Sequence, residues 1–300
     1  MSKHNQKAIV TIAIGNEYLA KWKKFCEPSW KRYAEKYGFD LICLQDPLDR
    51  SERGLMRSMS WQKCLVLSQD FASDYKQIVW VDADVIFNGF APDITAGTPV
   101  DKIGVVEDQQ FLHLALLKRA FKLWPEGEAV INYTAREYYT QYGLPADCDR
   151  SFNAGVMVLS PKLHRPLLEH VYYSYEEKEG GRKWNMEQRP LSYEAVKAGL
   201  AHWLDPRFNV LLWFEEYASY PFLQQPPPPD GFRPSKELLA RLKRKKQKFQ
   251  AVLRYALVRK LNTDVVNSVF QASYFLHFAS RLEEMSLVRE RPLSWWDILP

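Results

Sequence analysis

Several features that define specialised classes of protein are missing from this chain of 300 residues. Its four cysteines include no C-x-x-C pair, so the sequence indicates neither a zinc site nor a thiol redox motif. It has no apolar run near the ~20 residues that span a bilayer, and its opening lacks the pattern of a signal peptide. Hydrophobic residues make up 46% of the chain and charged residues 26%, which excludes a disordered chain. We therefore expect a globular protein of the cytoplasm.

Positive charge is concentrated in one stretch of the chain. The formal net charge is +5, yet ten of the 41 basic residues lie between positions 236 and 260, against the single acid Glu237. The rest of the chain is slightly acidic, which excludes a nucleic-acid binder whose cations track a groove. Three interpretations of the basic stretch stay open: a solvated helix, an amphipathic helix on an anionic membrane surface, or a binder of an acidic glycan.

The first part of the chain alternates apolar, β-rich runs with segments of helical periodicity. We expect strands at 7–15, 39–44, 77–87 and 102–108. We expect helices at 16–37, broken or kinked at Pro28, and at 60–69. Strands that alternate with helices predict an α/β fold with a mostly parallel central sheet covered by helices.

The second part of the chain is less regular. We expect strands at 151–160 and 274–278, with helices from 161 to about 178 and from 186 to 197. Residues 225–230, QPPPPD, form a proline-rich spacer before the basic stretch, which has the apolar periodicity of a helical insert. Because a strand returns after this insert, we expect one domain over residues 1–300.

Two carboxylates stand at the carboxyl end of an apolar run. Asp82 and Asp84 follow the buried run Val79-Trp80-Val81 within the strand predicted at 77–87. Open α/β sheets bind ligands at this edge, and alternate residues share a face, so both carboxylates can reach one divalent cation. Oxygen ligands suit Mg²⁺ or Mn²⁺, which would neutralise a diphosphate. The alternative is a pair of acids in a loop with no such role.

Two chemistries use a D-x-D pair after a strand. Phosphatases of the haloacid dehalogenase type use the first Asp as nucleophile, place it on the first strand and follow it with Gly and Thr. In this chain Val85 and Ile86 follow, and a complete strand-helix-strand unit precedes. Nucleotide-sugar transferases place D-x-D after the third or fourth strand. The position of Asp82 favours the second chemistry.

Four stretches, in order, carry a resemblance to a known family. They are IVTIAIGNEY at 9–18, WVDADVIF at 80–87, FNAGVMVLS at 152–160 and YFLHFAS at 274–280. With these stretches the chain resembles the GT-A glycosyltransferases, and most closely glycosyltransferase family 8. The resemblance implies a GT-A fold, a nucleotide-sugar donor of the UDP type, a bound Mn²⁺ or Mg²⁺, and transfer with retention of the anomeric configuration.

The resemblance also implies roles for individual residues. Asp82, Asp84 and His277 would hold the metal ion, Gln188 and Glu187 would lie beneath the anomeric carbon as catalytic residues, and Arg281 would bind diphosphate. The other implied donor contacts are Ala13, Asn16 and Tyr18 for the nucleoside, Lys63, Asp82 and Ala83 for the donor, and Asn153, Ala154 and Gly155 for the sugar. The chain departs from the family pattern at Arg189, Ser280 and Glu283, where the family has Asp, Gly and Lys.

The sequence therefore predicts a metal-dependent hexosyl- or pentosyltransferase that acts on a glycan or glycolipid acceptor. We expect a nucleotide-binding half at 7–108, a half for donor sugar and acceptor at 109–220, the insert at 221–262 and a closing segment at 263–300. Peripheral membrane contact through 236–260 stays open. The alternatives are a haloacid dehalogenase-like phosphatase that uses Asp82 and Asp84, and a non-catalytic module that binds a nucleotide sugar.

Overall fold

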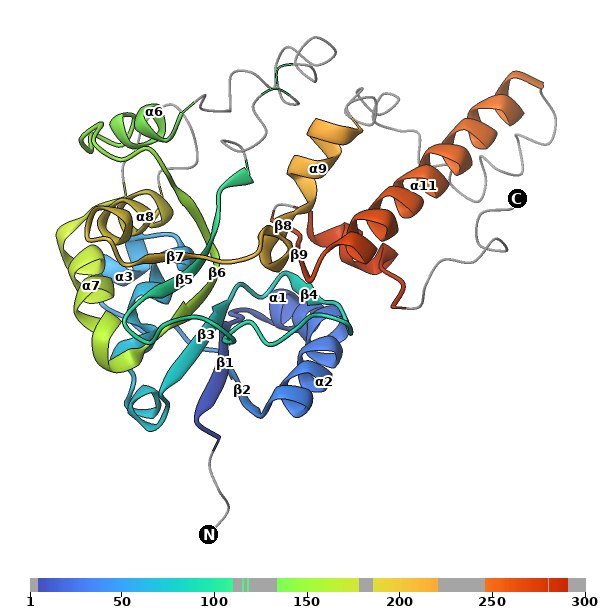
Figure 1. The fold of residues 1–300 in the computed structure, drawn as a ribbon. Helices are drawn as coiled ribbons and strands as arrows, with labels where there is room; N and C mark the ends of the chain where they lie inside the picture. The colour runs from blue at the N-terminus through green and yellow to red at the C-terminus, as the bar shows by residue number, and fades with distance from the viewer. Residues whose placement is uncertain are drawn as a thin grey trace.

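Two β-sheets organise the chain, whose computed structural model describes residues 5–109, 115, 118, 134–177, 186–220, 246–279 and 281–290 (Figure 1). The larger sheet has the strand order β2-β1-β3-β6-β5-β7. Its strands are β1 (Lys7–Ile12), β2 (Phe39–Leu44), β3 (Gln77–Val81), β5 (Ile103–Glu107), β6 (Phe152–Leu159) and β7 (Ala201–Trp203). The smaller sheet has the order β4-β9-β8, formed by β4 (Val85–Phe87), β8 (Val210–Leu211) and β9 (Phe275–His277).

The larger sheet is mostly parallel, which confirms the predicted architecture. Strand β1 pairs in parallel with β2 and β3, and β5 pairs in parallel with β7. Only β6 runs the other way, antiparallel to both β3 and β5. Its first residues therefore lie beside the carboxyl end of β3, where the backbone N–H of Asp82 donates to the carbonyl of Gly155 at 2.8 Å. This junction brings two of the sequence motifs together.

Both faces of the larger sheet are buried, as the near-continuous apolar runs predict. Along β3, Ile78 and Trp80 face one hydrophobic cluster while Val79 and Val81 face the other. The cluster around Trp80 includes residues of α7 (Pro161–Ser174) and α8 (Gln188–Lys197), which cover one side of the sheet in Figure 1. The cluster around Val79 includes residues of the N-terminal helices and of the smaller sheet.

The segment predicted as one helix at 16–37 is three consecutive helical elements. They are α1 (Asn16–Lys21), the π-helical η1 (Trp22–Cys26) and α2 (Glu27–Tyr37). Pro28 occupies the first turn of α2, a position at which proline is common in helices. Gly38 ends α2 in the left-handed conformation with φ of 69°. The helix register thus changes immediately before the proline.

Two elements differ from their predictions in ways that matter for the site. The helix predicted at 60–69 is present as a 3₁₀ helix, η2 (Met59–Ser68). The strand predicted at 77–87 is two strands, because the chain leaves the larger sheet after Val81 and joins the smaller sheet at Val85. Asp82 and Asp84 therefore lie in the turn between two sheets and not along one strand face.

The remaining elements connect these layers. They are α3 (Glu52–Met56), η3 (Asp70–Asp74), α6 (Ala135–Thr140), η5 (Pro206–Asn209), α9 (Leu212–Ser219), α11 (Lys246–Ala272) and η7 (Leu282–Leu287). The predicted helix from 161 to about 178 ends as α7 at Ser174, and the one predicted from 186 begins as α8 at Gln188. No helix among the described residues is long and apolar enough to cross a membrane.

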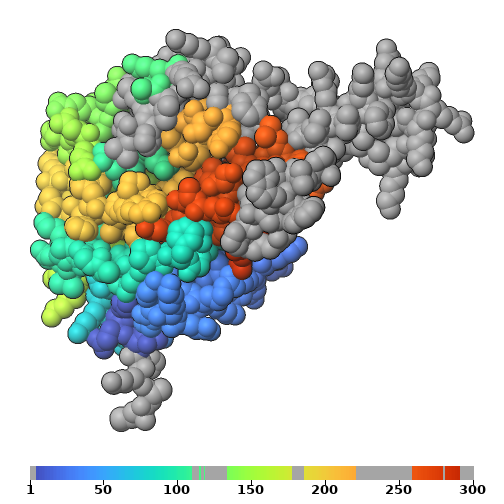
Figure 2. Space-filling model, turned by 45° about the vertical axis from the view of Figure 1, so that its right-hand side comes forward, coloured from blue at the N-terminus to red at the C-terminus, as the bar shows by residue number. Residues whose placement is uncertain are grey.

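The predicted insert falls largely outside the described residues. The proline-rich spacer and residues 221–245 are not among them, and neither are the side chains of 246–258. The helix of the insert is α11, which continues to Ala272, beyond the predicted boundary at 262. In Figure 2 the red stretch that contains the end of α11 lies against the orange stretch that contains α9, above the blue N-terminal helices. Residues of α11 share a hydrophobic cluster with residues of these N-terminal helices.

Candidate functional site

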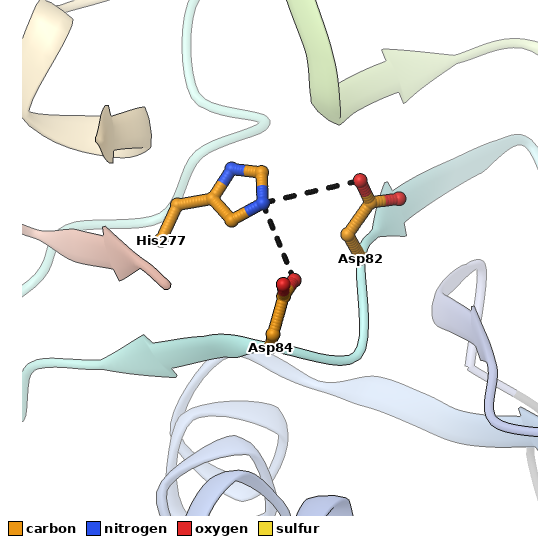
Figure 3. Close-up of side chains that lie close together, drawn as sticks. All are labelled: Asp82, Asp84 and His277. Atoms are coloured by element: carbon orange, nitrogen blue, oxygen red, sulfur yellow. Dashed lines mark ion pairs between the residues drawn. The ribbon is translucent and has the colours of Figure 1, made fainter. Parts of the chain in front are cut away.

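Three chain segments bring two carboxylates and an imidazole together. Asp82 follows β3, Asp84 precedes β4, and His277 is the last residue of β9. Figure 3 shows the three side chains pointing toward one another. Nε2 of His277 lies 3.2 Å from Oδ1 of Asp84 and 4.0 Å from Oδ2 of Asp82. The pairing of β4 with β9, which sets Val85 opposite His277, creates this arrangement.

The Asp82–Asp84–His277 cluster fits a divalent cation. One ligand atom from each residue lies within 4.8 Å of the other two. Asp84 is 7% exposed, and its Oδ1 faces Nε2 of His277 at 3.2 Å. A buried carboxylate is costly unless a cation, either a protonated imidazole or a metal ion, lies against it. Two carboxylates with one imidazole form a donor set suited to Mn²⁺, and Mg²⁺ also accepts carboxylate ligands.

A buried lysine controls the charge of Asp82. Nζ of Lys63 lies 3.0 Å from Oδ1 of Asp82 and 2.9 Å from Oε1 of Glu187, while the indole N–H of Trp80 donates to Oδ1 of Asp82 at 2.8 Å. Burial would raise the pKa of Asp82, but Lys63 and His277 outweigh it and lower that pKa. Burial would likewise lower the pKa of Lys63, yet the two carboxylates raise it. The contact is therefore between a carboxylate and an ammonium.

The acidic neighbours of His277 favour its protonated form. Burial would lower its pKa, but Asp84 and then Asp82 raise the pKa above the usual value for histidine. The other ring nitrogen, Nδ1, lies 3.0 Å from Oδ1 of Asn209. A cation that binds at Nε2 must replace the proton held there, because a metal ligand needs the free electron pair of that nitrogen.

Small and amide side chains surround the imidazole. A Cβ on Gly155 would lie 2.3 Å from Cε1 of His277, so the ring occupies the space that any other residue would fill. Asn153 accepts from the backbone N–H of Gly155 at 2.9 Å through Oδ1 and donates to Oε1 of Gln188 at 3.0 Å. The structure thus places Asn153, Gly155 and Gln188 in one network with the cluster.

The other predicted site residues are distributed around this network. The pKa of Tyr18 is raised by burial and further by the negative charges of Asp84 and Asp82. Ala13 is buried just after β1, and Asn16 is exposed at the start of α1. Ala83 is buried between the two acids. Nζ of Lys63 lies 3.4 Å from the carbonyl of Ala154 and also binds Glu187.

Arg281 lies after β9 but is held by α9. Its Nε is 3.3 Å from Oε2 of Glu216, and its guanidinium stands over the ring of Tyr217 at 5.9 Å. Glu216 is buried, whereas the Arg281 side chain keeps 30% of its surface exposed. The guanidinium is therefore anchored on one side and open to solvent on another.

Three residues of the network were missed from the sequence. Asn209 bonds His277 and Asn153, while Asp108 and the hydroxyl of Tyr138 both accept from Nε2 of Gln188. Asp108 ends the strand predicted at 102–108, so the rule applied to Asp82 would have found it. Asn209 precedes a short apolar run as Asp84 does, which is a weak signal. Nothing in the sequence around Tyr138 marks it.

Comparisons with known proteins show the fold. No family model and no curated protein matches this chain. The bifunctional glycosyltransferase WbbM, in its apo structure, superposes with a TM-score of 0.51 at 11% identity, over 93% of this chain and 46% of that one. The chain therefore shares its α/β fold with part of WbbM and spans less than half of its length.

Two further structures match with lower scores. A glycosyltransferase involved in the glycosylation of the major capsid of PBCV-1 has a TM-score of 0.47 at 13% identity, over 94% of this chain and 100% of that one. The galactosyltransferase LgtC, in complex with donor and acceptor sugar analogs, has a TM-score of 0.41 at 13% identity, over 70% of this chain and 78% of that one.

Proposed function

We propose that this chain is a metal-dependent glycosyltransferase related to family 8. It moves a hexosyl or pentosyl group from a nucleotide-sugar donor, of the UDP type, to a glycan or glycolipid acceptor. The observation that carries the proposal is the Asp82–Asp84–His277 cluster at the carboxyl end of β3, the edge at which open α/β sheets bind ligands. The GT-A-like fold shared with WbbM supports it.

The metal site accounts for the charge arrangement. Asp82, Asp84 and His277 would hold Mn²⁺ or Mg²⁺, which when bound neutralises a diphosphate and acts as Lewis acid for the departing nucleotide. Lys63 keeps Asp82 ionised and, with Trp80, fixes its carboxylate. The open side of Arg281 supplies a guanidinium for a diphosphate oxygen.

The donor sugar would bind beside the start of β6. Asn153 would offer amide hydrogen bonds to the sugar there, and the small side chain of Ala154 would leave space for it. Gly155 would face the sugar as well, and its missing Cβ also makes room for His277. Ala13, Asn16 and Tyr18, where β1 passes into α1, would line the nucleoside pocket.

The catalytic step is assigned to the start of α8. Gln188 holds a fixed orientation, because Oε1 accepts from Asn153 and from the N–H of Ala154 while Nε2 donates to Asp108 and Tyr138. Its amide oxygen would stabilise the oxocarbenium-like centre, and transfer would proceed with retention. Glu187, whose Oε2 is buried without a hydrogen bond to the described residues, is the second candidate beneath that carbon.

The contacts of Asp82 bear on the phosphatase alternative. A nucleophilic aspartate needs a free oxygen for attack, whereas Lys63 and Trp80 bind Oδ1 of Asp82 and Lys63 also lies 3.3 Å from Oδ2. These contacts favour a ligand role over a nucleophile role. A phosphatase would also release phosphate from a simple ester without any sugar nucleotide.

Ligand-dependent stability tests the proposal. We expect UDP, and not GDP or CDP, to raise the melting temperature with Mn²⁺ and not with a chelator; a ligand at 100 times its Kd adds about 2.7 kcal/mol. Asp84→Asn should abolish the shift because it removes a charged ligand. Asp264→Asn, which makes the same change beside Lys260 on α11, is the matched control and should retain it.

The outcomes separate the alternatives. A nucleotide shift that persists with chelator, or in Asp84→Asn, would contradict the metal role. Metal-dependent binding of a UDP-sugar without release of UDP over a panel of acceptors would indicate a non-catalytic binding module. Phosphate release that depends on Asp82 in the absence of a sugar nucleotide would indicate the phosphatase. Anomeric NMR of the product tests retention.

Membrane contact through 236–260 remains a proposal based on the charge of that stretch. Each cation near an anionic surface contributes about 1 kcal/mol, so ten basic residues could hold a peripheral enzyme on a glycolipid-bearing membrane. Co-sedimentation with vesicles that contain anionic lipid should then fall as salt rises. Equal sedimentation with neutral and anionic vesicles would contradict this contact.

A further inference from the structure

The smaller sheet places a buried asparagine directly behind the imidazole of the cluster. Strand β8 pairs in parallel with β9, which sets Leu211 opposite His277, and Asn209 lies just before β8 at the end of η5. Asn209 is 1% exposed. Its Oδ1 lies 3.0 Å from Nδ1 of His277, and its Nδ2 lies 2.9 Å from Oδ1 of Asn153.

Backbone groups decide which atom donates in each of these contacts. The N–H of Gly155 donates to the Asn153 side chain at 2.9 Å, so the atom it meets is the oxygen, Oδ1. That oxygen also faces Asn209, which must therefore present its NH₂ group. The other Asn209 atom is then an oxygen, and an oxygen beside Nδ1 of His277 requires a proton on Nδ1.

The far end of the network agrees with this assignment. Asn153 presents its NH₂ to Oε1 of Gln188, which also accepts from the N–H of Ala154 at 3.3 Å. The NH₂ of Gln188 then faces the carboxylate of Asp108 at 3.4 Å. An ionised carboxylate has no proton to donate, so it can only accept. The side-chain amides of Asn209, Asn153 and Gln188 are thus oriented by backbone N–H groups, which can only donate.

We propose that Asn209 is the positioning residue that makes His277 a metal ligand. By accepting the Nδ1 proton it holds the electron pair of the neutral ring on Nε2, the nitrogen 3.2 Å from Asp84. Metal-bound histidines donate their second N–H to an oxygen in this way, and loss of the partner costs about 10- to 100-fold in affinity or activity. This role rests on the metal site of the proposed function.

A second buried asparagine shows what a purely structural role looks like. Asn267 on α11 donates to the carbonyls of Thr263 and Leu287 and accepts from the N–H of Arg289. All of its partners are backbone groups, and it ties α11 to the chain around η7. Asn209 instead bonds the side chains of two site residues. Asn267→Leu is therefore the matched control for Asn209→Leu.

Direct Mn²⁺ binding, followed by EPR of the free ion with the full-length chain, tests the proposal. We expect Asn209→Leu to weaken Mn²⁺ binding by about 10- to 100-fold, because Leu has the size of Asn and no acceptor. Asn209→Asp should bind Mn²⁺ close to wild type, since its carboxylate still accepts the Nδ1 proton. Asn267→Leu should lower the melting temperature and leave Mn²⁺ binding unchanged.

The results distinguish this role from the metal site itself. Wild-type Mn²⁺ binding in Asn209→Leu, or equal loss in the Leu and Asp variants, would overturn the role of Asn209 and leave the metal site standing. No Mn²⁺ binding by the wild-type chain would overturn the metal site and this role with it.

The tautomer of His277 provides a measurement that needs no change at Asn209. In the ¹⁵N-histidine-labelled wild-type chain saturated with Mg²⁺, we expect Nδ1 protonated and Nε2 unprotonated, with the signal assigned by its loss in His277→Gln. A proton on Nε2 with Nδ1 bare would overturn the proposal even if every Asn209 variant fails to fold.

Discussion

Lys63 carries a positive charge at a place with almost no water. It is 4% exposed and contacts the carboxylates of Asp82 and Glu187, of which Glu187 is 3% exposed. A buried ammonium is tolerated only with such partners, and the partners in turn depend on it. The burial of Lys63 could not be predicted from the sequence, because a buried cation leaves no mark in hydrophobic periodicity.

Replacement of Lys63 should therefore be costly in a specific way. We expect Lys63→Met to lower the free energy of unfolding by about 3–5 kcal/mol, because the buried Glu187 and the partly exposed Asp82 are left without their cation. The double variant Lys63→Met/Glu187→Met should lose less than the single variant, since one uncompensated charge has gone. Urea unfolding of the wild type and both variants measures this difference.

Lys21 is the control for that experiment. It also contacts two carboxylates, Glu17 and Glu283, but on the protein surface. Because water and salt screen those contacts, Lys21→Met should change the stability far less. A similar loss in Lys21→Met and Lys63→Met would contradict the importance assigned to burial.

At the scale of elements, α2 holds the strand that follows Asp84. The indole N–H of Trp30 donates to the carbonyl of Val85 at 2.7 Å, and Ser29 accepts from the N–H of Phe87 at 3.2 Å. Trp22, eight residues earlier, is also buried, yet its indole N–H has no partner among the described residues. A comparison of the two tryptophans therefore distinguishes the contribution of the hydrogen bond from that of packing.

Trp→Phe substitutions at these two positions test that separation. Both remove the same atoms from a buried site, but only Trp30→Phe leaves the carbonyl of Val85 unpaired. We expect Trp30→Phe to cost about 1–3 kcal/mol more than Trp22→Phe in urea unfolding. Equal losses would mean that the bond from α2 to β4 contributes nothing beyond packing.

The start of α7 gives the protein a pH-dependent stability. Nδ1 of His164 accepts from the N–H of Ser160 at 2.9 Å, and burial lowers the pKa of His164 against a smaller raising effect of Asp101. The folded chain thus keeps His164 neutral where the unfolded chain binds a proton, below about pH 6.5. Stability from this group is present above that pH and is lost as the pH falls toward the lowered pKa.

A neutral replacement at position 164 should remove that pH dependence. Between pH 7.5 and 5.5 we expect the wild type to lose stability by up to about 1.4 kcal/mol per pH unit from this group. His164→Asn, whose amide oxygen accepts without titrating, should show a shallower loss in urea unfolding. His170→Asn, in the exposed part of the same helix, should retain the wild-type slope. A wild-type slope in His164→Asn would contradict the assignment.

Several elements follow from sequence pattern, and others do not. The strand at 39–44 has the predicted bounds, because an apolar run between Gly38 and a polar loop marks both ends. The strand at 77–87 does not, since β3 and β4 are both buried and periodicity cannot show that the chain changes sheets between them. The D-x-D pair could be identified from the sequence, but the positions of its two carboxylates depend on the turn between β3 and β4.

At the scale of the whole molecule, the candidate site depends on pairing between distant segments. The smaller sheet joins β4 to β8 and β9, which lie more than a hundred residues later in the sequence. Each of these strands has two or three residues. Strands this short carry no periodic signal, so Asn209 could not be connected to His277 without the structure, and His277 itself was found only through the family resemblance.

A cation at the site should tighten this long-range closure. Because Asp82, Asp84 and His277 come from segments about 190 residues apart, Mn²⁺ should slow amide exchange in β4, β8 and β9. Edge strand β2, on the far side of the larger sheet, should exchange at an unchanged rate. Hydrogen exchange with and without Mn²⁺ measures both. Uniform slowing over all strands would instead indicate global stabilisation, and no slowing in β9 would contradict the ligand role of His277.

The close approach of Gly155 to His277 couples the substitutions that positions 155 and 277 can accept during evolution. A Cβ at 155 and an imidazole at 277 exclude each other in space, since the added atom would lie 2.3 Å from the ring. The two positions must therefore vary together among descendants of this chain. A lineage that lost the histidine could accept any small side chain at 155, whereas one that keeps it must keep the glycine. A larger residue at 155 would then mark a cation site given up, even where both aspartates persist.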